Sequence, residues 1–266
     1  MTHPYTYIDP NAKLAPNVKI DPFTVIHSDV QIGEGTWIGS NVTIMDGTRI
    51  GKNCRIFPGA VLGGVPQDLK FAGEKSLVII GDNTTIREFV TINRGTIDRG
   101  KTTVGSNCLI MAYSHIAHDC NIGNNVIMSN SVQVAGHVTV GDFAVIGGVS
   151  AVHQFVQVGQ HSFVAGGSLV SKDVPPYIKA VRNPLSYGGV NSVGLKRRGF
   201  SLQQINHILD IYRVIYNKGF NTTQALEFIE EELTASDERD EIVTFIRESG
   251  RGIIKRFTKG SNDDES

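Results

Sequence analysis

The sequence gathers side chains that suit acid–base chemistry in one stretch. His118 is followed directly by Asp119, and a carboxylate beside an imidazole can fix the ring tautomer and raise its basicity, as a general base requires. Gly136 precedes His137, and a ligand could approach its N–H, as oxyanion stabilisation requires. These residue types indicate acyl transfer to a hydroxyl group. Four of the eight histidines fall in this stretch, namely His115, His118, His137 and His153.

Other chemistries fit the sequence less well. Three histidines could bind zinc, but His115 and His118 are three residues apart and His137 is nineteen further on, unlike the ligand spacing of β-helix carbonic anhydrases. No GxSxG motif marks a nucleophilic serine. The three cysteines are odd in number and lack CxxC spacing, so we expect neither a disulfide framework nor a cysteine-rich metal site.

Composition narrows the class of protein. With 25 Lys and Arg against 26 Asp and Glu, the chain of 266 residues is nearly neutral, which argues against bulk nucleic-acid binding. No apolar run is long enough to span a membrane, and the start MTHPYTYIDPNAK lacks the order of a secretory leader. We therefore expect a cytoplasmic protein without stable membrane insertion.

A six-residue repeat positions these side chains. Counting every sixth residue from Ile8 to Val170, 25 of 28 positions are Ile, Leu, Val or Met, and four residues after each of them 27 of 28 are Ala, Val, Thr, Ser or Cys. This period is typical of a chain wound into a parallel β-helix with three short strands per coil. The side chain at the aliphatic position points into the prism. The side chain four residues later also points inward, where space is tight, so it must be small.

The coil of 18 residues predicts which distant residues become neighbours. Position 118 stacks against 136 and 154, so His118, the Gly136–His137 pair and the His153–Gln154 pair come together on the outside of the prism. The cysteines Cys54, Cys108 and Cys120 occupy the small inward position, which indicates packed thiols rather than nucleophiles. The segments GGVPQDLKFAGEKSLVI and TIDRGKTT interrupt the pattern and are expected to protrude as loops.

The C-terminal part follows a different pattern. The repeat stops at DVPPY, and we expect a linker at RNPLSYGGVNSVG. A helix begins at Ser201, with Gln204 completing a capping box, and two more begin near Thr222 and Ser236. The acidic tail SNDDES is expected to be disordered. The predicted fold is mainly β, with a parallel β-helix domain over residues 1–190 and a small C-terminal α-helical domain over residues 191–266.

Several motifs together resemble one family. The acyl-(acyl-carrier-protein):UDP-N-acetylglucosamine O-acyltransferases, which begin lipid A synthesis, share this order of motifs along a hexapeptide prism with a helical tail. The resemblance implies a left-handed β-helix, a homotrimer with active sites between adjacent prisms, and no cofactor beyond the phosphopantetheine of the acyl carrier protein. The motifs are PQDLKFAGE, HIAHDC, AGHV, AVHQF, DVPPY and NSVGLKRRGFS.

The resemblance also implies residue roles. His118 would be the general base, Asp119 would orient it, and the Gly136 N–H would stabilise the oxyanion, without a covalent enzyme intermediate. Gly166 would cap the acyl pocket and, lacking a side chain, would admit a chain such as 3-hydroxytetradecanoyl or longer. The expected substrate-binding residues are Asp68 and Lys70 for sugar or pantetheine, His115, His137, His153 and Gln154 in the cleft, and Asn191, Arg197 and Arg198 for the nucleotide and its diphosphate.

The sequence fits two other functions less well. A purely structural β-solenoid would need neither a polar column nor the KRRG motif. An N-acylating glucosamine enzyme of the same pathway would usually carry an extra N-terminal domain, whereas the repeat begins at Ile8. Val193 and Asn93 replace a Glu and a His that family members can carry, which affects ligand contacts rather than the reaction. Acyl length, and whether the acceptor carries a 3-hydroxyl or a 3-amino group, stay open.

Overall fold

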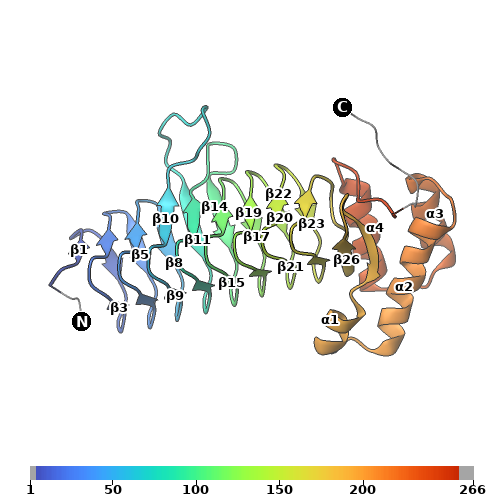
Figure 1. The fold of residues 1–266 in the computed structure, drawn as a ribbon, viewed down its shortest axis with the longest axis horizontal. Helices are drawn as coiled ribbons and strands as arrows, with labels where there is room; N and C mark the ends of the chain where they lie inside the picture. Colours follow the sequence, from blue (N-terminus) through green and yellow to red (C-terminus); the bar gives the residue numbers. More distant parts are fainter. Residues whose placement is uncertain (1–3, 258–266) are drawn as a thin grey trace.

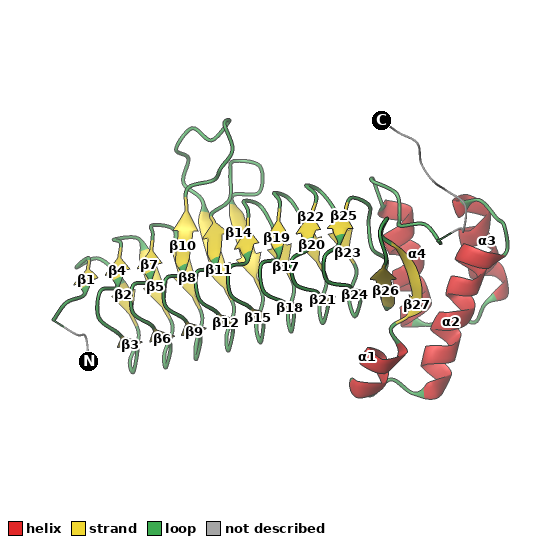
Figure 2. Ribbon diagram, in the orientation of Figure 1, coloured by secondary structure: helices red, strands yellow, loops and turns green. Residues whose placement is uncertain are grey.

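The computed structural model describes residues 4–257, and the acidic tail SNDDES lies outside them. The chain winds into a three-sided prism whose faces are three parallel sheets, with the N-terminus at one end and the helices at the other (Figure 1). Strands at equivalent places in successive coils pair with each other, so each sheet runs the length of the prism (Figure 2).

Each sheet contains every third strand. The first sheet consists of β1 (Tyr7–Ile8), β4 (Val25–Ile26), β7 (Thr43–Ile44), β10 (Val61–Gly64), β13 (Thr91–Asn93), β16 (His115–Ile116), β19 (Gln133–Val134), β22 (Ala151–Val152) and β25 (Leu169–Val170). The second consists of β2 (Lys13–Leu14), β5 (Val30–Ile32), β8 (Thr48–Ile50), β11 (Leu77–Ile80), β14 (Lys101–Val104), β17 (Asn121–Ile122), β20 (Thr139–Val140) and β23 (Gln157–Val158). The third consists of β3 (Lys19–Ile20), β6 (Trp37–Ile38), β9 (Arg55–Ile56), β12 (Thr85–Ile86), β15 (Leu109–Ile110), β18 (Ile127–Met128), β21 (Val145–Ile146), β24 (Phe163–Val164), β26 (Ile178–Val181) and β27 (Ser186–Val190).

The predicted coil length and loops are confirmed. Paired residues such as Thr43 and Val61, or His115 and Gln133, are 18 positions apart. The spacing grows to 30 between β10 and β13 and to 24 between β13 and β16, because one loop follows Gly64 and another follows Asn93. We call them the first loop (residues 65–76) and the second loop (residues 94–100). Both protrude from the same part of the prism (Figure 1).

Aliphatic side chains fill the prism. Ile26, Ile44 and Leu62 are fully buried and lie one above another in paired strands. The three cysteines are packed thiols, as expected: the Cys120 Sγ donates to the Ala135 carbonyl at 3.1 Å, and burial raises its pKa to about 12. The repeat count also assigned Thr96 to a small inward position, but Thr96 lies in the second loop, where the register has no structural meaning.

Left-handed backbone conformations turn the corners. The third residue after the inward aliphatic has a positive φ in coil after coil, including 58° at Asp119, 63° at His137 and 66° at Phe155. Asparagine and glycine tolerate this conformation best. Aromatic and histidine residues adopt it here because the inward residues on both sides of the corner are held in the core.

The segment expected to be a linker is ordered. Residues Ser186–Val190 form β27, which pairs antiparallel with β26, and Ser192–Arg197 form the short helix α1. The antiparallel strand covers the edge that the last parallel strand would otherwise leave open, which a linker would not do. Hydropathy periodicity misses both elements because β27 is rich in glycine and α1 is only six residues long.

The three predicted helices are present. They are α2 (Leu202–Asn217), α3 (Thr222–Glu232) and α4 (Asp237–Glu248), and Ser201 with Gln204 forms the predicted capping box. The Tyr212 hydroxyl of α2 donates to the Pro176 carbonyl at 2.6 Å, which ties the helices to the prism. The division into domains at residue 190 stays a prediction. None of the helices in the described residues is long and apolar enough to cross a membrane.

Candidate active site

His118 and Asp119 form a hydrogen-bonded dyad on a corner of the prism. Their segment is anchored at both ends, because Ile116 and Cys120 point into the core. The left-handed conformation of Asp119 turns its carboxylate back toward the preceding ring, and Oδ2 lies 2.9 Å from His118 Nδ1. With the Nδ1–H donated to the carboxylate, Nε2 is the nitrogen that can accept a proton from a substrate.

The carboxylate of Asp119 is fully buried and held by the second loop. Thr96 donates its hydroxyl to Oδ2 at 2.6 Å and its N–H to Oδ1 at 3.0 Å, while the Arg99 N–H reaches Oδ1 at 3.2 Å. Burial acts to raise the pKa of Asp119, but the hydrogen bonds from Thr96 and His118 outweigh it and the pKa is lowered. Asp119 is therefore an anion at neutral pH.

Gly136 lies against the ring of His118. A Cβ at position 136 would stand 2.7 Å from both Cε1 and Nε2 of His118, so a side chain here would displace the imidazole. Within residues 4–257 the Gly136 N–H donates to no other backbone group. This leaves a donor beside Nε2, which suits the stabilisation of an oxyanion that forms as His118 takes a proton.

His137 completes the cluster from the next coil. Its ring meets that of His118 edge to face at 5.1 Å, and its Nε2 lies 3.8 Å from Asp119 Oδ2. Asp98 of the second loop approaches Nδ1 to 3.2 Å, but without hydrogen-bond geometry. Burial lowers the pKa of His137, with Asp119 opposing the shift, so the ring is neutral near pH 7 and can donate a hydrogen bond.

The other cleft histidines lie around this cluster. His115 is on β16, where its Nδ1 is 2.7 Å from the Thr91 hydroxyl, and burial lowers its pKa. His153 is exposed one coil further on, and its Nδ1 is 3.1 Å from the Gln154 carbonyl. The ring that stacks on His137, at 4.6 Å, belongs to Phe155 rather than to His153. The order of this column is the one that the 18-residue coil predicts.

Asp68 and Lys70 project on the first loop. The Lys70 N–H donates to Asp68 Oδ1 at 2.9 Å, a local turn that leaves the Lys70 ammonium exposed. The two loops are joined, since Glu74 Oε1 accepts from the Ile97 N–H at 3.0 Å. No described contact brings Asp68 or Lys70 to His118, so their binding role stays a prediction.

The predicted nucleotide residues line a cavity of about 560 Å³ between the third sheet and α1. Arg197 is exposed there. Arg198 donates to the Phe143 carbonyl at 2.9 Å, and its buried Nη1 has no partner among the described residues. The Asn191 side chain already has partners within the protein: it caps α1 and donates its Nδ2–H to the His161 carbonyl at 2.9 Å.

Gly166 lies at an exposed corner near the end of the prism. A Cβ there would come 3.1 Å from the Gly148 carbonyl oxygen of the preceding coil. The Cβ would therefore face the backbone of the preceding coil. The role of Gly166 at the end of an acyl pocket stays a prediction.

Metal binding at the dyad is disfavoured by its own hydrogen bonds. Ligand atoms of His118, Asp119 and His137 lie within 4.8 Å of one another, close enough in principle to share an ion. However, the Asp119 oxygens already accept from Thr96, Arg99 and His118. A cation would have to break these contacts, so the arrangement fits a base held by a carboxylate better than a metal centre.

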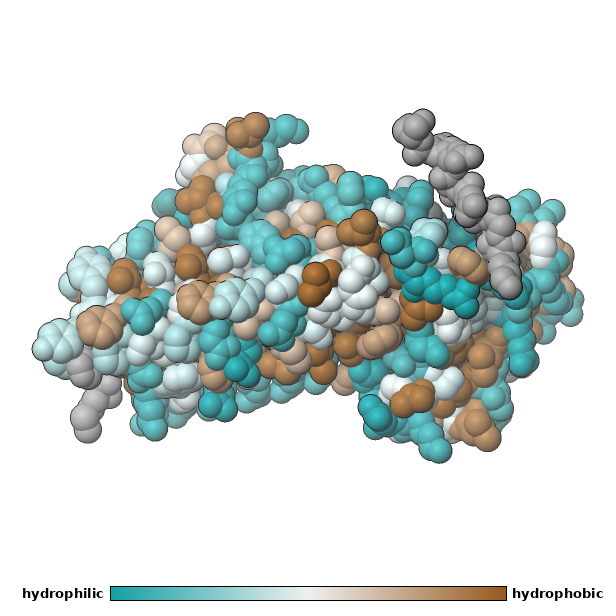
Figure 3. Space-filling view, viewed as in Figure 1, coloured by the Kyte–Doolittle hydropathy of each residue, from teal (hydrophilic) through white to brown (hydrophobic). Residues whose placement is uncertain are grey.

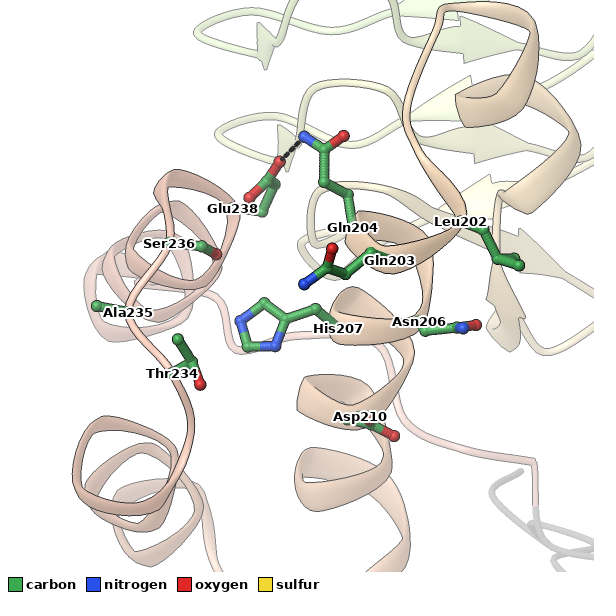
Figure 4. Close-up of a pocket in the computed structure, with 10 residues that line it drawn as sticks. All are labelled: Leu202, Gln203, Gln204, Asn206, His207, Asp210, Thr234, Ala235, Ser236 and Glu238. Atoms are coloured by element: carbon green, nitrogen blue, oxygen red, sulfur yellow. Dashed lines mark hydrogen bonds between the residues drawn. The ribbon is translucent and has the colours of Figure 1, made fainter.

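A larger cavity, of about 640 Å³, lies between α2 and the segment that leads into α4 (Figure 4). His207 points across it toward Thr234, and Gln204 donates to Glu238 at 2.8 Å. This cavity is lined only by residues of the helical part and contains none of the predicted site residues.

The residues that support the dyad and its neighbour do not follow from the repeat alone. Thr96 and Arg99 contact Asp119, and Thr91 contacts His115. Part of the signal was present, because the register places Thr91 directly beside His115 in neighbouring strands. The contacts of the second loop depend on how it folds back, which the repeat does not encode.

The fold and the site define a class of protein: an acyltransferase of the hexapeptide-repeat type. A family model for bacterial hexapeptide transferases matches residues 29–64 and 101–136, and one described as UDP N-acetylglucosamine O-acyltransferase, domain 2, matches residues 173–254. The acyl-(acyl-carrier-protein)–UDP-N-acetylglucosamine O-acyltransferase of Xylella fastidiosa is 45% identical over 257 residues, which cover 96% of this chain and 98% of that protein. This chain belongs to that O-acyltransferase family, and it is an enzyme.

Solved structures of acyltransferases are also similar to this chain. A UDP-N-acetylglucosamine acyltransferase from Bacteroides fragilis is 50% identical with a TM-score of 0.94, covering 96% of this chain and all of that one. One from Francisella novicida is 43% identical with a TM-score of 0.93, covering 96% of this chain and 94% of that one. The left-handed parallel β-helix that the resemblance implied is thereby confirmed.

Proposed function

We propose that this enzyme transfers a 3-hydroxyacyl group from the thioester of acyl carrier protein to the glucosamine 3-position of UDP-N-acetylglucosamine, the first step of lipid A biosynthesis. The observation that carries the proposal is the buried His118–Asp119 dyad, with the open N–H of Gly136 beside it. The names of the relatives supply the substrates.

In the proposed mechanism His118 acts as a general base. Nε2 takes the proton from the 3-hydroxyl while that oxygen attacks the thioester carbonyl carbon. The Gly136 N–H donates to the oxyanion of the tetrahedral intermediate. When the intermediate collapses, the C–S bond breaks and the pantetheine sulfur leaves with the proton that Nε2 had taken. The enzyme forms no covalent bond, and the only cofactor involved is the phosphopantetheine that the carrier brings.

Other predicted residues bind the two substrates. Arg197 and Arg198 hold the diphosphate, since a guanidinium pairs with two phosphate oxygens at once. The same cations could also attract the acidic surface of a carrier protein. Asp68 and Lys70 contact sugar or pantetheine, and Gly166 lies at the end of the acyl chain.

We propose a homotrimer, with the dyad in a cleft between adjacent prisms. The two loops support this, because they carry exposed apolar residues on the part that protrudes from the prism (Figure 3). Leu69 and Ile97, fully or largely exposed in the single chain, would be covered by a neighbouring prism. In solution the mass is then three times the chain mass of 28.9 kDa. A cytoplasmic location stays a prediction.

The reaction is tested by incubating the enzyme with UDP-N-acetylglucosamine, or its 3-amino analogue, and a panel of acyl carrier proteins. Mass spectrometry of the products gives the acyl length and the acceptor atom. We expect one acyl group per sugar and free carrier thiol in equal amounts. Absence of any acylated sugar with every donor contradicts the proposal.

The mechanism is tested by His118→Ala. We expect kcat to fall at least about 100-fold, as for loss of a general base, with the oligomer intact. His207→Ala is the control, because His207 lies on α2 beside a cavity that contains no site residue. Near-normal turnover of the His118 variant would refute the assignment of the base.

A further inference from the structure

We infer that Thr96, on the second loop, is a positioning residue that keeps Asp119 oriented toward His118. This inference rests on the proposed role of His118 as the base. Thr96 is buried and would act through these two residues rather than on the substrate directly.

Thr96 donates hydrogen bonds to both oxygens of the Asp119 carboxylate. Thr96 is 6% exposed, and its hydroxyl donates to the same oxygen, Oδ2, that accepts from His118 Nδ1. Its N–H is shared between Oδ1 at 3.0 Å and Oδ2 at 3.2 Å. One residue therefore fixes both the direction of the carboxylate and the oxygen that faces the imidazole.

The second loop is built to hold Thr96 in place. The Gly100 N–H donates to the Thr96 carbonyl at 2.8 Å, which closes the loop into one turn. Gly100 has a φ of 66°, a conformation that glycine adopts without strain. The Arg99 guanidinium donates to the Asp119 carbonyl at 2.9 Å, and Glu74 of the first loop accepts from the Ile97 N–H.

Rotation of the Asp119 carboxylate would remove the partner of His118 Nδ1. The ring could then carry its proton on Nε2, which would disable it as a base. Asp119 is fully buried, so the hydroxyl of Thr96, rather than solvent, is the donor that holds Oδ2 in place beside the ring. The titratable groups that contact this carboxylate are His118 and His137. Asp98 faces the other nitrogen of His137, and the Arg99 guanidinium donates to the Asp119 backbone carbonyl.

The test compares Thr96→Val with Thr96→Ser in the full-length enzyme. Valine keeps the shape and the N–H but removes the hydroxyl, whereas serine restores it. We expect kcat to fall about tenfold or more in the valine variant, the loss of a hydrogen bond to a charged group, with KM for UDP-N-acetylglucosamine unchanged. Serine should recover kcat to within about threefold of the natural enzyme.

The pH profile separates positioning from a structural role. Without the hydroxyl, the carboxylate is held less firmly toward Nδ1, so the imidazolium that forms when His118 takes a proton loses part of its stabilisation. The acid limb of kcat/KM against pH reports protonation of the free base, so it should move to lower pH in the valine variant and return in the serine variant. A merely structural role would lower the melting temperature and leave this limb in place.

Two further variants keep the test decisive. Thr103→Val removes a hydroxyl that bonds to Asn121 on the second sheet, and it should leave kcat and the acid limb unchanged. Thr96→Cys keeps a weakly donating group and carries the test if the valine variant does not fold, with an intermediate kcat expected. If His118→Ala is inactive while the Thr96 variants keep the natural kcat and acid limb, the inference about Thr96 fails and the proposed base stands. An active His118→Ala variant would overturn both.

Discussion

Gly136 and His118, 18 residues apart, are in contact in such a way that the first can have no side chain. A Cβ on Gly136 would lie 2.7 Å from the catalytic nitrogen Nε2 of the proposed base, well inside van der Waals distance. The same close approach keeps the Gly136 N–H close to the imidazole of His118. The glycine therefore both makes room for the imidazole and supplies a donor beside it.

Gly136→Ala should impair the enzyme although it keeps the N–H. The added methyl pushes the imidazole of His118 away from its partner, so we expect kcat to fall about 100-fold with little change in melting temperature. The measurements are steady-state kinetics and thermal unfolding. Gly250→Ala serves as the control, because a Cβ there meets nothing within 4 Å. Equal activity of the two variants would contradict the contact.

The repeat made much of this geometry predictable. Because each coil has 18 residues, the sequence alone placed Gly136 beside His118 and the cysteines inside the prism. It failed where the chain leaves the repeat: Thr96 satisfied the count but lies in a loop, and β27 carries no hydropathy pattern. The repeat encodes register, whereas loop contacts depend on a fold-back that no local rule specifies.

Stability should fall with acid because of His161. The ring is stacked between Phe143 and Tyr177, and burial, aided by Arg198, lowers its pKa to about 4. The unfolded chain binds a proton on this ring near pH 6.5, whereas the folded chain binds it only near pH 4. The free energy of unfolding is therefore highest above pH 6.5 and falls as the pH is lowered from 6.5 toward 4.

Between these two pH values the free energy of unfolding should fall by about 3 kcal/mol. Urea unfolding at pH 7 and pH 5 should show a loss of stability in the natural chain and a smaller loss in His161→Phe, which keeps the aromatic stack. An identical pH dependence in both would show that His161 does not titrate in this way.

The two adjacent arginines should respond differently to removal. Arg197 is exposed and free to bind phosphate, so Arg197→Ala should raise KM for UDP-N-acetylglucosamine about tenfold without affecting stability. Arg198 also donates to Phe143, so Arg198→Ala should raise KM and lower the unfolding free energy by about 1–3 kcal/mol. Lys196→Ala, a neighbouring exposed cation, is the control. An unchanged KM in the Arg197 variant would argue against its phosphate contact.

Chelators should leave the rate unchanged. The oxygens of Asp119 are occupied by Thr96 and His118, so the dyad gains nothing from an ion. Turnover measured after dialysis against EDTA should equal that of the untreated enzyme. Inhibition that added zinc reverses would revive a metal centre made of His118, Asp119 and His137.

Gly166→Met should shift the enzyme toward shorter acyl donors. Gly166 is exposed at a corner near the end of the prism, and a methionine there would occupy space in which we propose that the end of the acyl chain lies. The Cβ itself comes 3.1 Å from the Gly148 carbonyl, which the backbone can accommodate by moving a few tenths of an ångström.

Gly166→Ala separates these two effects, because alanine makes the same contact with Gly148 but adds almost no length. Competition among carrier proteins loaded with different acyl chains gives the ratio of kcat/KM values for each variant. We expect methionine to invert the preference toward the shorter chain and alanine to preserve it, because only methionine fills the pocket. If methionine leaves the ratio as in the natural enzyme, the acyl chain ends elsewhere and Gly166 does not measure its length.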